Sequence, residues 1–218
     1  KGNKKQTFTN DLLFNGFREL KSIWRSLKHD KRLKRYLRAF FVYSMAVQTV
    51  MLVATYFGIE EIDWSGQDAT TGLIISILLI QLVAIAGAML TSRFALRIGN
   101  INTLVIINLI WIGICVYAFF IRTPNEFYLT AGAVGLVMGG IQALSRSTYS
   151  KMLPPETLDT ASYFSFYDVS EKIGIVIGML LYGIIAQLTG SIRFSILFLI
   201  VFFVSGVILL LRVPRLPK

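Results

Sequence analysis

FSILFLIVFFVSGVILLL, residues 194–211, holds no charged side chain over 18 consecutive positions. A helix rises about 1.5 Å per residue, so about 20 apolar residues cross the roughly 30 Å hydrocarbon core of a bilayer. Stretches of the same kind recur at residues 39–59, 69–92, 98–121, 127–145 and 173–192. The stretch at 173–192 is expected to begin earlier, near Ser162, and to carry charged residues into the membrane. The sequence therefore predicts an all-α integral membrane protein with six transmembrane helices.

The composition excludes other classes. Of the 218 residues, 55% are hydrophobic and 16% are charged, and the mean hydropathy is +0.64. A soluble domain has about 25% charged residues. A membrane β-barrel would show segments of about ten residues in which apolar and polar side chains alternate, whereas these stretches are continuously apolar. The loops between them are too short to hold a separate catalytic domain, so any function is expected among the helices.

The basic residues predict the orientation of the helices, because loops rich in Lys and Arg stay cytoplasmic. Nineteen of the 22 Lys and Arg residues fall on one side, twelve of them before the first span. Both termini of this chain are therefore expected in the cytoplasm, and a bacterial cytoplasmic (inner) membrane is the expected location. The predicted division is a basic cytoplasmic connector, residues 1–38, and a six-helix transmembrane half-domain, residues 39–218.

The connector is predicted to contain an amphipathic helix that lies on the membrane surface. Its apolar residues recur at helical spacing, and the basic residues fall on the other face. The stripe consists of Leu13, Phe17, Leu20, Trp24 and Leu27. A solvated linker is the alternative, and this stripe argues against nucleic-acid binding. A basic start without Met favours an internal connector of a longer protein.

Cysteine and histidine usage argues against catalysis. Cys115 lies in the middle of the third span and His29 in the connector, and each is the chain's single residue of its type. A metal site built from His and Cys therefore cannot form, and a serine protease within the membrane would lack its His base. We expect no enzyme activity, no cofactor and no metal.

Polar side chains within the spans mark the helices that could line a path, because an unpartnered polar group facing lipid is costly. The first, second, fourth and fifth spans carry such residues and are expected to face inward, while the third and sixth face outward. The predicted path residues are Tyr43, Gln48, Gln81, Gln142 and Tyr167. For each glutamine, hydrogen bonding between helices is the alternative to substrate contact. Small residues at every fourth position of the fourth span, from Ala131 to Ala143, predict close helix packing.

A charged trio in the fifth span is the candidate for proton coupling or for a charge pair. Asp168, Glu171 and Lys172 lie three or four positions apart, so they share one broad helical face on which acid and amine can neutralise each other. A charge facing the bilayer centre costs at least about 2.5 kcal/mol, so this face should meet protein or water. The alternative is a helix that starts late and leaves the trio at the cytoplasmic headgroups. Arg146 is a further candidate partner for the acids.

Two sequence patterns resemble a known family. They are the run GGIQALSRSTYSKMLPPE, residues 139–156, and a following set of aromatic, basic and glycine residues, namely Phe164, Tyr167, Lys172, Gly178, Tyr182 and Gly183. They resemble the vacuole-effluxer-like (autophagy-related amino-acid effluxer) branch of the major facilitator superfamily. The resemblance implies helices seven to twelve of a twelve-helix secondary transporter, whose N-terminal six-helix half is a missing partner. It also implies alternating access and export of amino acids or similar small solutes.

The cytoplasmic loop motif of the superfamily has a degraded counterpart at residues 92–100. Arg97 and Gly99 match the motif, but Leu96 replaces its Asp. The resemblance therefore implies a gating loop at Arg97 and Gly99, with Arg146 in the next cytoplasmic loop. The competing hypothesis is a complete six-helix protein that forms a homo-oligomeric channel or a membrane scaffold, although no filter sequence or charge ring is visible.

Overall fold

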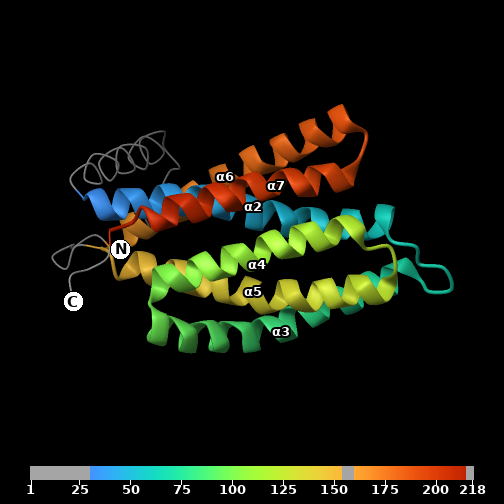
Figure 1. Ribbon diagram of the computed structural model, residues 1–218, viewed down its shortest axis with the longest axis horizontal. Coiled ribbons are helices and arrows are strands. Elements are labelled where there is room, and N and C mark those ends of the chain that lie inside the picture. Colours follow the sequence, from blue (N-terminus) through green and yellow to red (C-terminus); the bar gives the residue numbers. More distant parts are fainter. Residues whose placement is uncertain (1–29, 154–159, 215–218) are drawn as a thin grey trace, which may run out of the picture.

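Six membrane-length helices make up the described part of the protein. The computed structural model describes residues 30–153 and 160–214. The helices are α2 Lys31–Glu61, α3 Ala69–Ile98, α4 Asn100–Phe120, α5 Pro124–Ser150, α6 Thr160–Thr189 and α7 Ile192–Leu211 (Figure 1). Within these residues no strand occurs, and each helix is long and apolar enough to cross a bilayer. The predicted all-α membrane fold is confirmed.

The helices extend further than the uncharged stretches that predicted them. The carboxylate of Asp30 caps α2 by accepting hydrogen bonds from the backbone N–H groups of Arg32 at 2.8 Å and Leu33 at 3.0 Å. The helix therefore begins inside the predicted connector and crosses its boundary at residue 38. α6 begins at Thr160, so the late start of this helix is wrong, whereas the position of the charged trio relative to the headgroups stays a prediction. The predicted amphipathic stripe, residues 13–27, lies outside the described residues.

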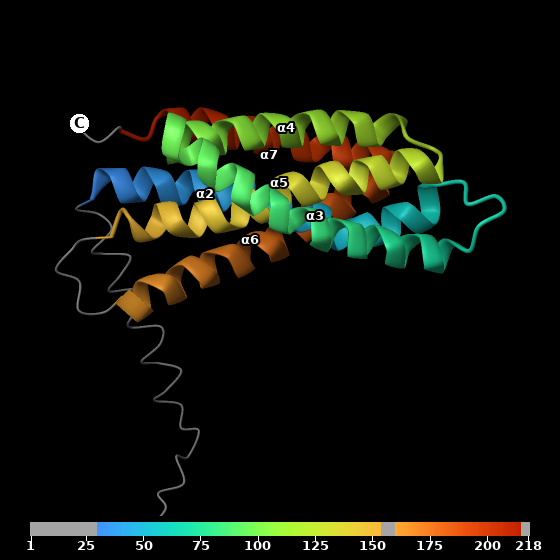
Figure 2. The ribbon, with the colours of Figure 1, turned by 90° about the horizontal axis from the view of Figure 1, so that it is seen from below.

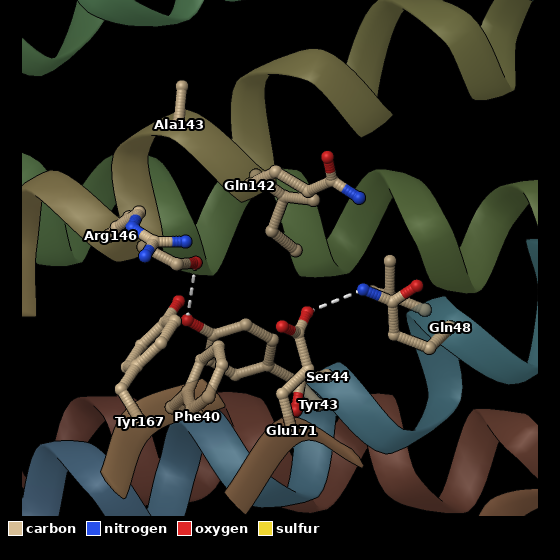
Figure 3. A pocket seen from close by; sticks show the side chains of 12 residues that line it. Phe40, Tyr43, Ser44, Gln48, Gln142, Ala143, Arg146, Tyr167 and Glu171 are labelled. Carbon is tan, nitrogen blue, oxygen red and sulfur yellow. Dashed lines mark hydrogen bonds between the residues drawn. The ribbon is translucent and has the colours of Figure 1, made fainter. Parts of the chain in front are cut away.

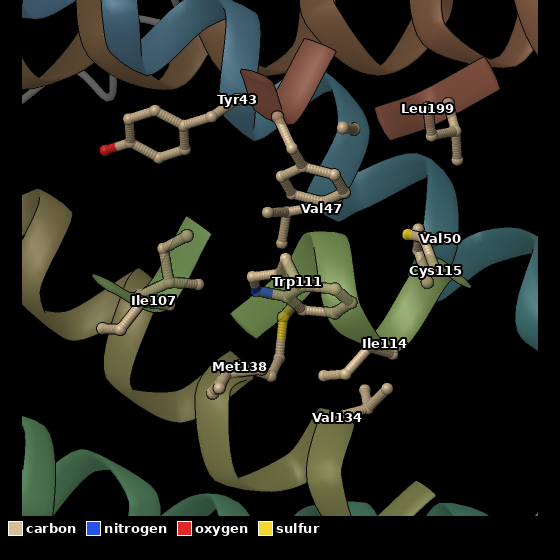
Figure 4. Close-up of a cluster of buried hydrophobic side chains, with 14 of the residues drawn as sticks. Tyr43, Val47, Val50, Ile107, Trp111, Ile114, Cys115, Val134, Met138 and Leu199 are labelled. Carbon is tan, nitrogen blue, oxygen red and sulfur yellow. The ribbon is translucent and has the colours of Figure 1, made fainter. Parts of the chain in front are cut away.

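The bundle has three layers, which Figure 2 shows in side view. α4 and α7 form one outer layer, α2 and α5 lie in the middle, and α3 and α6 lie on the opposite side. The rings of Trp111 on α4 and Phe203 on α7 stack with centroids 5.5 Å apart, and both are fully buried. This core continues to Val47 on α2 and Met138 on α5 (Figure 4).

The third span was expected to face outward, and it lies in an outer layer of the bundle as α4. Its polar residues Asn108 and Thr103 are buried on the side that packs against the other helices. Each residue hydrogen-bonds a carbonyl four positions earlier, Asn108 through its amide and Thr103 through its hydroxyl. A polar side chain can thus be buried against protein by bonding its own helix. The opposite face of α4 is exposed and apolar, as at Ile106 and Leu109.

α3 and α5 pack with their backbones in direct contact. A Cβ atom added to Gly139 would collide with the carbonyl oxygen of Ala84, and one added to Gly87 would collide with the carbonyl of Leu136. The small residues of the fourth span therefore serve the close packing that the sequence predicted, and α3 is the helix against which they pack. Gly135 makes the same kind of contact, with its Cβ position 2.7 Å from the carbonyl oxygen of Ile80.

A buried arginine joins three helices at the end of the bundle where α7 begins. The Nε of Arg193 donates to a carboxylate oxygen of Glu61 at 2.5 Å, and its Nη2 donates to the Glu61 carbonyl at 2.9 Å. Its Nη1 donates to the carbonyls of Phe119 and Ile121, each at 2.7 Å. The guanidinium also lies 5.5 Å from the ring centroid of Phe57. This Arg193 clamp ties the last turn of α2 and the end of α4 to the start of α7.

Candidate functional site

A cavity of about 350 Å³ lies between α2, α5 and α6 (Figure 3). Its size falls within the range of roughly 300–1,000 Å³ that is usual for small-molecule sites. The lining combines aromatic, amide, hydroxyl and charged groups. We call it the central cavity; its lining residues are Phe40, Tyr43, Ser44, Val47, Gln48, Ile141, Gln142, Ala143, Ser145, Arg146, Tyr167 and Glu171.

Helical periodicity brings these side chains together. Residues three or four apart share a face of a helix, and the lining positions of each helix follow that spacing. This interval separates Tyr43 from Val47 on α2, Gln142 from Arg146 on α5, and Tyr167 from Glu171 on α6. Three helix faces that would each be too polar for lipid thus meet one another around the cavity.

One hydrogen bond crosses the cavity between α2 and α6. The side-chain amide of Gln48 donates to a carboxylate oxygen of Glu171 at 2.5 Å, which Figure 3 shows. Gln142 on α5 has no comparable partner among the described residues, since its amide makes only a long contact of 3.9 Å with the Met138 sulfur. Its side chain is exposed in the cavity lining and is available to a solute.

An ion pair on the rim of the cavity joins α5 to α6. The guanidinium of Arg146 lies 3.4 Å from the carboxylate of Asp168, with 56% and 46% of the two side chains exposed. The guanidinium also lies 5.3 Å from the ring centroid of Phe164 and 5.9 Å from that of Tyr167. A pair this exposed adds little to stability. It does place a positive and a negative charge together beside the cavity.

The expected neutralisation within the charged trio is not what the structure shows. Asp168 on α6 pairs with Arg146 on α5, and Glu171 accepts a hydrogen bond from Gln48 on α2. Lys172 is exposed and lies outside the cavity lining. The side chains of a helix diverge by about 100° per residue, so the neighbours Glu171 and Lys172 point in different directions.

Tyrosines on α2 close one side of the cavity against α5. The hydroxyls of Tyr36 and Tyr43 lie 2.7 Å from the carbonyl and the hydroxyl of Ser145, respectively. The ring of Phe40 stacks on that of Tyr167 with centroids 4.0 Å apart. Phe40 and Ser145 line the cavity but were not among the predicted path residues. Their spacing of three or four positions from Tyr43 and Gln142 is the signal that would have found them.

Other predicted site residues lie elsewhere. Gln81 is exposed on α3, away from the cavity lining. Arg97 is exposed in the last turn of α3, and Gly99 joins α3 to α4 with a φ of 87°, a conformation that favours glycine. Arg146 was predicted in a loop, and that prediction is wrong. It lies within α5, because the sequence offers no Gly or Pro to end the helix between Arg146 and Pro154.

The arrangement favours binding of a small polar solute. Its lining offers amide and hydroxyl groups, a guanidinium and the Glu171 carboxylate, and a second carboxylate, that of Asp168, pairs with the guanidinium. Across residues 30–153 and 160–214, no group of three or more His, Cys, Asp or Glu side chains comes close enough to hold a metal ion.

Comparison with known proteins gives consistent matches. A family described as "Vacuole effluxer Atg22 like" matches residues 1–216. A Bacillus subtilis (strain 168) protein named "Uncharacterized MFS-type transporter YxiO" is 30% identical over 204 residues, which cover 94% of this chain and 46% of that protein. "Autophagy-related protein 22" of Vanderwaltozyma polyspora is 30% identical over 207 residues, or 88% of this chain and 38% of that protein. The corresponding Saccharomyces cerevisiae (strain S288c) protein is 30% identical over 192 residues, or 81% and 35%. The chain thus spans less than half the length of these relatives.

Proposed function

The chain belongs to the vacuole effluxer Atg22-like family, and from this premise we propose that it is the C-terminal half of a major-facilitator-type secondary transporter. The residues before α2 would connect it to an N-terminal six-helix half outside this chain. The exposed apolar surface of the outer layer formed by α3 and α6 supports a further contact with lipid or with that half, as at Leu82 and Leu180. A homo-oligomeric channel or scaffold is not favoured, because the relatives are longer transporters.

The proposed mechanism is alternating access. Two six-helix halves would rock about a solute held between them, near the middle of the membrane. The central cavity supports this proposal, because it opens between helices rather than being enclosed by them and so could be completed by a second half. A multi-pass membrane location follows from the six helices. The bacterial cytoplasmic membrane and cytoplasmic termini remain part of the proposal.

The proposed substrate is an amino acid or a similar small zwitterion that the protein exports. The observation that carries this proposal is the juxtaposition of opposite charges at the cavity. Arg146 could bind a carboxylate, while Asp168 and Glu171 could bind an ammonium group. Gln142 adds an amide with no strong partner of its own. Glu171 and Asp168 are also the proposed sites of proton coupling, because they are the carboxylates closest to this path.

Transport by the intact protein in sealed vesicles tests this function. Uptake of radiolabelled amino acids would be measured with and without a proton gradient. We expect Gln142→Ala and Glu171→Gln to lower transport by about tenfold or more. The first removes an amide that is available to the solute, and the second removes the negative charge proposed to bind an ammonium group, a charged contact worth about 1.5–3 kcal/mol. Glu171→Gln should also reduce the dependence on the proton gradient.

Gln187→Ala is the matched control, because Gln187 is exposed on α6 outside the cavity lining. It should transport at the parental rate. Equal transport by the Gln142 and Gln187 variants would contradict the assignment of the cavity. A conductance that does not saturate with solute would favour the channel hypothesis instead.

A further inference from the structure

Three arginines line a groove where α2 begins and α7 ends. These two helix ends lie side by side in Figures 1 and 2. The groove has a volume of about 290 Å³ and is lined by Arg35 and Arg38 of α2 and by Leu209 and Arg212 of α7. It is separate from the central cavity, with which it shares no residue. We call it the arginine groove.

The arginines are held close together by the two helices. Arg35 and Arg38 are three positions apart and therefore neighbours on the surface of α2. The Nη1 of Arg35 donates to the carbonyl oxygen of Arg212 at 3.0 Å. Arg212 is the C-cap residue that follows Leu211, the last residue of α7, so this carbonyl lies at the negative end of the helix. The bond fixes Arg35 beside Arg212 and leaves its remaining N–H groups free for another acceptor.

The positive charge of the groove is not neutralised by the described residues. In residues 30–153 and 160–214 the ion pairs are those of Arg146 with Asp168 and of Arg193 with Glu61, and neither involves the groove. The end of α7 supplies a partial charge of only about −0.5. Three guanidinium groups around one hollow repel one another, and an anion between them would relieve that repulsion. Guanidinium groups bind phosphate oxygens through paired hydrogen bonds.

An apolar ridge on α7 runs from the groove toward the middle of the membrane. Leu211, Ile208, Val204 and Val201 recur at intervals of three, four and three residues and are 64%, 48%, 41% and 55% exposed. They lie on the face next to the one that bears Leu209 and Arg212, because neighbouring residues are about 100° apart around a helix. An anion bound in the groove could therefore carry an apolar chain along this ridge.

We propose that the arginine groove binds the phosphate headgroup of an anionic phospholipid, with an acyl chain against the ridge on α7. Basic pockets between transmembrane helices at the cytoplasmic side bind such headgroups. The basic end of this bundle is the end predicted to be cytoplasmic by its excess of Lys and Arg. The proposal does not depend on the transported solute.

Lipid retention by the intact protein tests the proposal. The protein would be purified from vesicles of phosphatidylglycerol and phosphatidylcholine, and its bound lipids would be counted by native mass spectrometry. The groove variant Arg35→Gln/Arg38→Gln/Arg212→Gln should retain at least about tenfold less phosphatidylglycerol, because each arginine near an anionic surface contributes substantially to binding. The amount of bound phosphatidylcholine should not change. Thermal unfolding in phosphatidylcholine alone verifies that the variant is folded.

A charge-matched variant separates a site from general attraction. Lys31→Gln/Arg93→Gln/Lys151→Gln removes three exposed positive charges near the same end of the bundle but outside the groove. It should retain phosphatidylglycerol at the parental level. Equal loss from both triple variants, or no loss from the groove variant, would overturn the proposal.

A second arm separates a lipid from a free phosphate. Glycerol 3-phosphate would be added to the protein in phosphatidylcholine, and its effect on the melting temperature would be compared with that of phosphatidylglycerol. Stabilisation by the lipid alone, lost in the groove variant, supports the proposal. Equal stabilisation by glycerol 3-phosphate would show a phosphate site without a role for the acyl chain and would contradict the lipid assignment.

Discussion

Replacing Arg193 by Met should strongly destabilise the protein. Only 10% of the Arg193 side chain and 23% of the Glu61 side chain are exposed, so the variant would leave a largely buried carboxylate without its cation. It would also remove the donors to the carbonyls of Phe119 and Ile121. Removing one partner of a buried ion pair costs about 3–5 kcal/mol. We expect a loss of that order in the free energy of unfolding, because Met fills the space but supplies no donor.

The thiol of Cys115 can report this loss. Only 1% of Cys115 is exposed, so the thiol reacts with an alkylating reagent when the bundle opens. Labelling of the intact protein would be followed by mass spectrometry of the peptide that contains Cys115. A loss of about 3 kcal/mol corresponds to labelling that is faster by roughly a hundredfold.

Two further variants test whether the loss of stability comes from the Arg193 clamp. Arg122→Met changes an exposed arginine at the same end of the bundle and should leave the labelling rate almost unchanged. Arg193→Met/Glu61→Leu should recover part of the stability, since it removes the stranded carboxylate together with its partner. Parental labelling in Arg193→Met, or a double variant no more stable than the single one, would refute the account of the Arg193 clamp.

Three other predictions follow from the described contacts. Gly139→Leu should lower the melting temperature, with a cost of about 1–3 kcal/mol from collision with the backbone of α3, whereas Gly113→Leu, which meets open space, should not. Hydrogen bonds from the hydroxyl and the backbone N–H of Thr71 hold the pKa of the Asp68 carboxyl below its ordinary value of 3.8. The cap is therefore complete above pH 3.8 and is lost as the pH falls through the lowered pKa. Hydrogen exchange of the amides in the first turn of α3, corrected for its intrinsic rate, should accelerate over that fall in pH. The same amides in Asp68→Asn should show no such pH dependence. Tyr43→Phe should cost about 1 kcal/mol in thermal unfolding, because it removes a buried hydrogen bond to α5.

The number and type of the helices could be predicted because uncharged stretches of membrane length have few alternatives. Their ends could not. The uncharged stretch ends at Arg38, whereas α2 itself extends back to Lys31 and is capped by the carboxylate of Asp30. Charged side chains are compatible with a helix where it leaves the hydrocarbon region, so charge marks the edge of the membrane better than it marks the end of the helix.

Helical spacing identified several of the residues that line the central cavity, including Gln48, Gln142 and Glu171. Their roles stay predictions. Gln81 lies outside this lining, because the rotation of a helix about its own axis depends on its packing partners, and α3 turns its glycine face to α5. The Arg193 clamp could not be predicted either, since its acceptors come from distant positions and most are backbone carbonyls, which every residue possesses.

The backbone contact between α3 and α5 has a mechanical consequence. With carbonyl oxygens occupying the places of Cβ atoms, neither helix can slide or twist past the other without steric overlap, so the two behave as a single stiff rod. Any displacement of α5, which carries Arg146, must therefore also move the exposed apolar surface of α3 relative to its surroundings. Where those surroundings are lipid tails, the rate of the motion would depend on membrane thickness and fluidity, so the rate of the proposed transport cycle should change with the chain length of the bilayer lipids.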